Sequence, residues 1–107
     1  MLKICKMDIN NKDVLDIPIG EKFLGVGQYR GRLHVLFLAD YTNQTRKVQF
    51  NIYVTDDEIT DNPGNYIGTF VENDYQFYVF YKVIGRTKSE EYEEEYKEYQ
   101  KNYSNGR

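Results

Sequence analysis

Residues Arg46–Thr55 read RKVQFNIYVT, and apolar and polar side chains alternate along the whole stretch. Alternation with a period of two places successive side chains on opposite faces of an extended chain. The apolar face would hold Val48, Phe50, Ile52 and Val54, and the polar face Lys47, Gln49, Asn51 and Tyr53. This stretch therefore predicts a β-strand with one face in a core and the other in water.

A second stretch, Arg32–Asp40, reads RLHVLFLAD and is apolar on both faces, so we expect it at the centre of a sheet. Tight turns are expected at Arg30-Gly31 and at Asn73-Asp74. In the segment between Lys22 and Tyr29, Gly25 and Gly27 share one face, which indicates a bulge or a close approach by a neighbour. The other extended segments are expected at Leu2–Ile9, Val14–Ile17, Lys22–Tyr29, Tyr66–Glu72 and Tyr75–Ile84.

The predicted fold class is mainly β (α+β). Short strands at intervals of roughly ten residues are typical of a compact antiparallel sandwich or small barrel, here with five to six strands. The 11 Tyr and 6 Phe residues support this class, because aromatic side chains suit half-buried pleated surfaces. We assign residues 1–85 to this β domain.

The final segment, residues 86–107, has a different pattern. Four tyrosines spaced by four, three and four positions predict one stripe of an amphipathic α-helix over about Lys88–Asn102. Thr87 and Glu90 have the spacing of a capping box at the start of that helix. The stripe, which comprises Tyr92, Tyr96, Tyr99 and Tyr103, could pack on the sheet, bind a second copy or another protein, or stay solvated as a disordered tail.

Composition narrows the class of protein. The 107 residues carry a net charge of −3, which argues against a general binder of nucleic-acid backbones. A single cysteine excludes an internal disulfide. No apolar run approaches the ~20 residues of a membrane helix, and no signal peptide is evident. We therefore expect a cytoplasmic protein with no membrane contact.

Residues with catalytic or metal-binding chemistry are sparse. His34 is the sole histidine and could act as a base or a metal ligand, but a packing role in its apolar strand is favoured. Cys5 lacks a surrounding catalytic signature. The acidic loop Asp56–Asp61 fails the calcium-loop pattern, and Gly25-Val26-Gly27 lacks the remaining parts of a phosphate loop. We predict no catalytic residue, no metal and no cofactor.

Two sets of residues are candidates for binding. The four tyrosines of the C-terminal stripe are the expected contact anchors for a partner protein, because tyrosine is enriched at interface hot spots. A second set could form a basic patch with an aromatic platform if its strands adjoin, and comprises Tyr29, Arg30, Arg32 and Arg46. Tyr53 could add stacking surface to that patch.

The stretches VLDIPIGEKFLGV, DNPGNYIGTF and FYVFYKV resemble a family of small, mostly uncharacterised bacteriophage and prophage proteins, over about residues 2–83. In that family an acidic-Pro-Gly-x-Tyr-Ile-Gly-Thr segment links a loop to the penultimate strand, as Asp61–Phe70 do here. The resemblance implies a β-rich domain of phage origin and supplies no activity. The chain departs from the pattern at VTDDEIT, where relatives carry a glycine and a histidine.

We therefore expect a non-enzymatic, phage-encoded binding protein that inhibits or modulates a host or defence factor through protein–protein contacts. The first alternative is an oligomeric module that sequesters an anionic nucleotide signal with the basic patch. The second alternative is a virion component or a nucleic-acid-associated accessory protein.

Overall fold

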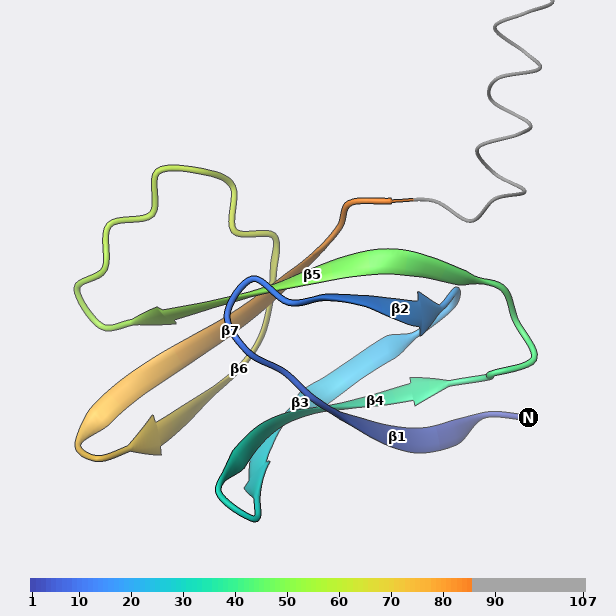
Figure 1. Cartoon of the computed structure of the whole chain (residues 1–107), viewed down its shortest axis with the longest axis horizontal. Helices are drawn as coiled ribbons and strands as arrows, with labels where there is room; N and C mark the ends of the chain where they lie inside the picture. Colours follow the sequence, from blue (N-terminus) through green and yellow to red (C-terminus); the bar gives the residue numbers. More distant parts are fainter. Residues whose placement is uncertain (86–107) are drawn as a thin grey trace, which may run out of the picture.

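The computed structural model describes residues 1–85 of the chain. These residues form seven strands, β1 (Lys3–Asp8), β2 (Val14–Pro18), β3 (Lys22–Tyr29), β4 (Arg32–Ala39), β5 (Thr45–Val54), β6 (Asn65–Glu72) and β7 (Tyr75–Val83). The strands pair antiparallel in two sheets, β1-β4-β3 and β2-β5-β7-β6. Figure 1 shows the two sheets, and the chain crosses between them in the connections from β1 to β2, from β2 to β3 and from β4 to β5.

The mainly β, antiparallel prediction is confirmed, and β4 is the central strand of its sheet as expected. Because β3 packs beside β6 with no ladder between them, the fold is a sandwich and not a closed barrel. Residues 1–85 contain no helix, so the α part of the predicted class has no support there. The helix expected over Lys88–Asn102 lies outside the described residues.

The predicted count of five to six strands is wrong, because the described residues form seven. The short run at Val14–Ile17 is a complete ladder partner of β5, with Val14 opposite Gln49 and Pro18 opposite Thr45. Pro18 is tolerated because β2 is the edge strand of its sheet. A five-residue strand shows too little alternation to be counted from its own sequence.

One aromatic cluster joins the two sheets. The ring of Phe23 on β3 lies 5.8 Å from the ring of Phe37 on β4, 5.8 Å from that of Phe50 on β5 and 4.2 Å from that of Tyr81 on β7. Phe37 and Phe50 are fully buried, and burial of one such side chain contributes roughly 1.5–3 kcal/mol. The other buried apolar residues surround the cluster, and are Ile9, Ile17, Val35, Ala39, Val48 and Val79.

Both predicted hairpin turns are confirmed. Arg30 and Gly31 connect β3 to β4 with φ angles of 52° and 76°, and Asn73 and Asp74 connect β6 to β7 with 51° and 67°. Two consecutive positive φ angles define the hairpin turn whose twist matches that of the paired strands. The predicted bulge is also present, since the register of β3 shifts between Phe23 and Gly25.

A buried amide anchors the loop before β6. Asn51 is 1% exposed, and its Nδ2 donates to the carbonyl of Pro63 at 2.8 Å while its Oδ1 accepts from Lys12 Nζ at 3.0 Å. The next residue, Gly64, has φ of 98° and passes so close to β7 that a methyl group there would lie 2.0 Å from the carbonyl oxygen of Tyr81. The Asn-Pro-Gly segment therefore secures the fold.

We predict that Gly64→Ala lowers the free energy of unfolding by more than about 1 kcal/mol, because it combines a strained φ with a clash against backbone. Gly27→Ala adds the same methyl group where nothing lies within 4 Å, and its effect should stay within about 0.5 kcal/mol. Chemical denaturation followed by circular dichroism measures both. Equal stability of the two variants would contradict this role of Gly64.

Candidate ligand pocket and binding surfaces

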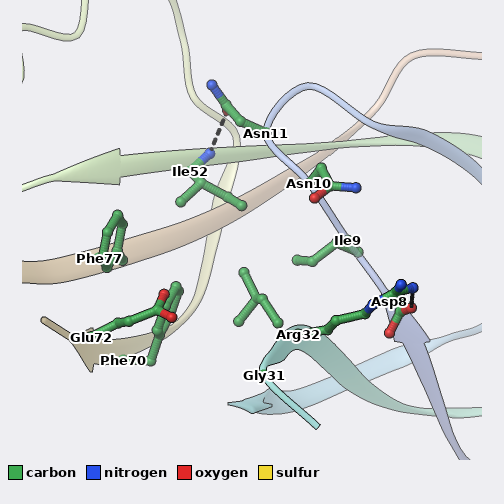
Figure 2. Close-up of a pocket in the computed structure, with 11 residues that line it drawn as sticks. Asp8, Ile9, Asn10, Asn11, Gly31, Arg32, Ile52, Phe70, Glu72 and Phe77 are labelled. Atoms are coloured by element: carbon green, nitrogen blue, oxygen red, sulfur yellow. Dashed lines mark hydrogen bonds and ion pairs between the residues drawn. The ribbon is translucent and has the colours of Figure 1, made fainter. Parts of the chain in front are cut away.

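A pocket of about 560 Å³ opens at one end of the sandwich (Figure 2). It lies where the end of β1 and the β3–β4 turn face the ends of β5 and β6 and the start of β7. Five apolar side chains form its floor, from both sheets: Ile9, Leu33, Ile52, Phe70 and Phe77. The rings of Phe70 and Phe77 stack with centroids 4.8 Å apart and planes 10° apart. The end of the core is thus open to solvent.

Polar side chains form the rim of this pocket. Arg32 Nη1 lies 3.3 Å from Asp8 Oδ2, an ion pair between neighbouring strands. Asn11 Oδ1 accepts a hydrogen bond of 2.9 Å from the backbone N–H of Ile52. Glu72 also lines the pocket, and within residues 1–85 its carboxylate makes no ion pair or hydrogen bond. Glu72 follows Phe70 by two residues on β6, so the two side chains point to the same face of the strand (Figure 2).

His34 lies on the outer face of β4, next to the pocket. Its Nε2 pairs with Asp8 Oδ1, its Nδ1 is 3.1 Å from the carbonyl of Arg32, and its ring meets that of Tyr29 edge to face at 5.7 Å. Cys5 stands opposite Phe37 on the other face of that sheet, so the two residues do not converge. Within residues 1–85 no group of three His, Cys, Asp or Glu side chains could hold a metal.

The predicted basic patch is brought together only in part. Tyr29, Arg30 and Arg32 lie at the β3–β4 turn, where Arg30 Cζ is 5.4 Å and Lys6 Nζ 3.5 Å from the ring centre of Tyr29. Arg46 lies near the start of β5, in the other sheet and at the far end of the sandwich. The strands that carry Arg32 and Arg46 are not neighbours, so the four predicted residues do not form one patch.

Arg46 forms an ion pair with a residue that is distant in the sequence. Its Nη2 lies 3.1 Å from Glu21 Oε1, and the Glu21 side chain is only 4% exposed. The two residues are 25 positions apart and meet because β2 pairs with the start of β5. This guanidinium therefore contributes to the fold.

A row of aromatic side chains covers the outer face of the four-stranded sheet, and we call Tyr53, Tyr66, Tyr78 and Phe80 the aromatic face. The ring of Phe80 meets that of Tyr53 edge to face at 5.7 Å and that of Tyr66 at 5.6 Å. Tyr78 stands opposite Tyr53 in the ladder, and its hydroxyl is 3.3 Å from Thr55 Oγ1. Tyr66 is 56% exposed.

Sequence reasoning missed the aromatic face, although a signal for it was present. The alternation that places Ile52 and Val79 in the core places Tyr53, Tyr78 and Phe80 on the opposite side. Aromatic side chains on the outer face of a strand are the signal. The predicted contact anchors, Tyr92, Tyr96, Tyr99 and Tyr103, lie outside the described residues.

Comparison with known proteins gives a single finding. A family model described as a domain of unknown function (DUF7352) matches residues 1–89. Neither the curated proteins nor the solved structures gave a significant match. Nowhere in residues 1–85 does the chain form a helix with the length and hydropathy of a transmembrane span.

We predict that Glu21→Gln lowers the free energy of unfolding by about 1–3 kcal/mol, because it leaves the half-buried Arg46 guanidinium without its charged partner. Asp16→Asn is the matched control, since it removes one carboxylate from an ion pair with Lys47 whose two side chains are more than half exposed. Such a pair contributes about 0–1 kcal/mol. An unchanged unfolding midpoint for Glu21→Gln would contradict the structural role of Arg46.

Proposed function

This chain belongs to the DUF7352 family of unknown function, and we propose that it is a non-enzymatic binding domain whose aromatic face holds a partner protein. The observation that carries the proposal is the row of Tyr53, Phe80 and Tyr66 on the outer side of the four-stranded sheet. Tyr66 at one end of this row is 56% exposed, whereas Tyr53, Tyr78 and Phe80 are half-buried, and Lys12 Nζ lies 5.8 Å from the ring centre of Tyr53.

The chemistry of these side chains suits a protein surface. Tyrosine presents a flat apolar body with a polar hydroxyl, so it can stay in water when free and pack tightly when bound. The edge-to-face contacts with Phe80 hold the rings of Tyr53 and Tyr66 in place, which reduces the entropy lost on association. Buried aromatic anchors commonly supply most of the free energy of a protein interface.

The C-terminal tyrosines extend the same proposal. Tyr92, Tyr96, Tyr99 and Tyr103 repeat the residue type of the aromatic face, and they remain predicted anchors for the partner. The resemblance to phage and prophage proteins favours a phage origin, and a host or defence factor in the bacterial cytoplasm as the partner.

The nucleotide alternative has less support. Tyr29 would be the stacking platform, but the Lys6 ammonium already lies 3.5 Å from its ring centre. Arg46, one of the expected anion ligands, is paired with Glu21 at the far end of the sandwich. A base could stack on Tyr29 only by displacing Lys6 from that face of the ring.

We predict that Tyr66→Lys in the full-length chain weakens partner binding by at least tenfold, because truncation of an interface hot spot costs about 2 kcal/mol or more. Affinity capture from bacterial host lysate identifies the partner, and a binding titration with that partner measures the change. Tyr66 lies on an edge strand and is 56% exposed, so the variant should fold as the wild type does.

Ile4→Lys is the matched control, because Ile4 is 73% exposed on β1, an edge strand of the other sheet. It should bind like the wild type. Retention of wild-type affinity by a folded Tyr66→Lys variant would contradict the proposal. Analytical ultracentrifugation measures whether the free chain forms a dimer. If it does, and if Tyr66→Lys abolishes the dimer, the partner is a second copy of this chain.

Replacement of all four C-terminal tyrosines by serine then measures how much these residues contribute to the affinity for the partner.

A further inference from the structure

We infer that the pocket at the open end of the sandwich is a separate binding site for a small organic cation, an arylalkyl or alkyl ammonium group. The site is independent of the proposed function, because it opens at the end of the core whereas the aromatic face lies on the outer side of the sheet. Shape, apolar floor and charge each support this class of ligand.

The size and floor of the pocket suit a compact apolar body. Its volume of about 560 Å³ lies within the roughly 300–1,000 Å³ typical of small-molecule sites. Ile9 in the floor is 3% exposed, so this floor is continuous with the core of the sandwich. A ring or short alkyl chain seated on Ile52, Phe70 and Phe77 would cover apolar surface that the two sheets leave open.

The charges around the rim select a cation. Two carboxylates, Asp8 and Glu72, line the pocket with one guanidinium, Arg32. That guanidinium pairs with Asp8 at 3.3 Å, so these two opposite charges offset each other. Glu72 has no such partner within the described residues, which leaves one negative charge at the rim. An ammonium group would meet this charge, and a ligand carboxylate would be repelled by it.

The stacked rings of Phe70 and Phe77 strengthen the preference of the pocket for a cation. Phe70 and Phe77 line the pocket on adjacent strands, and Glu72 lines the same pocket two residues after Phe70 on β6, so its side chain points to the same face as the Phe70 ring. A cation within about 6 Å of an aromatic ring centre is attracted by the negative charge of the ring face. Glu72 supplies a carboxylate and the rings supply π-faces, so the same part of the pocket offers both recognition elements.

The test is an NMR titration of the full-length ¹⁵N-labelled chain with three probes that share one phenyl ring: 2-phenylethylammonium, 2-phenylethanol and 3-phenylpropionate. We expect the ammonium to bind with a dissociation constant of roughly millimolar order and the anion to bind at least about threefold more weakly. Amide shifts should concentrate in residues 9–11, 31–33 and 70–77, the segments that surround the pocket.

Glu72→Gln should weaken ammonium binding about two- to fivefold and leave the binding of the neutral alcohol unchanged. Asp74→Asn is the matched control, because it removes one carboxylate from the adjacent turn without altering the pocket, and it should bind as the wild type does. Equal or tighter binding of 3-phenylpropionate, or an unaltered affinity in Glu72→Gln, would overturn the cation assignment. The absence of shifts from all three probes at about 20 mM would overturn the site itself.

Discussion

The packing of one ring, Phe23, against Phe37, Phe50 and Tyr81 is the contact on which the fold depends. These four residues come from β3, β4, β5 and β7, so the cluster spans both sheets. No ladder connects the sheets, and therefore side-chain packing and chain connections must hold them face to face. Within residues 1–85 the core holds eight buried hydrophobic side chains and Pro18, so it is small, and one end of the sandwich is open as a pocket.

The features that follow from local periodicity could be predicted from the sequence. Alternation in Arg46–Thr55 identifies β5, and the positive φ angles that two-residue hairpins need are found at Arg30-Gly31 and Asn73-Asp74 as expected. Features that depend on distant pairing could not be predicted. Whether Arg46 is free or paired with Glu21 depends on where β2 meets β5, and the pocket depends on how the ends of β1, β5 and β6 lie relative to the β3–β4 turn.

The loop before β6 contains residues that stabilise the fold, and it leads into a residue of the aromatic face. Asn62, Pro63 and Gly64 are consecutive in this loop, and each has a structural task here. Asn62 Oδ1 accepts from Gly64 N–H at 3.0 Å, Pro63 accepts from buried Asn51, and Gly64 fits against β7. Tyr66 comes two residues after Gly64, and its ring is exposed to solvent beside Phe80. The same segment thus fixes the loop and presents the first residue of the aromatic face.

We propose that a partner protein binds on the outer side of the four-stranded sheet. Hydrogen–deuterium exchange of the full-length chain, alone and with its captured partner, locates the surface that becomes protected. We predict that binding slows amide exchange in peptides from β6 and β7, and leaves exchange unchanged in peptides from β1, the edge strand of the other sheet. Slowed exchange confined to β1 and β4, with β6 and β7 unaffected, would contradict the account.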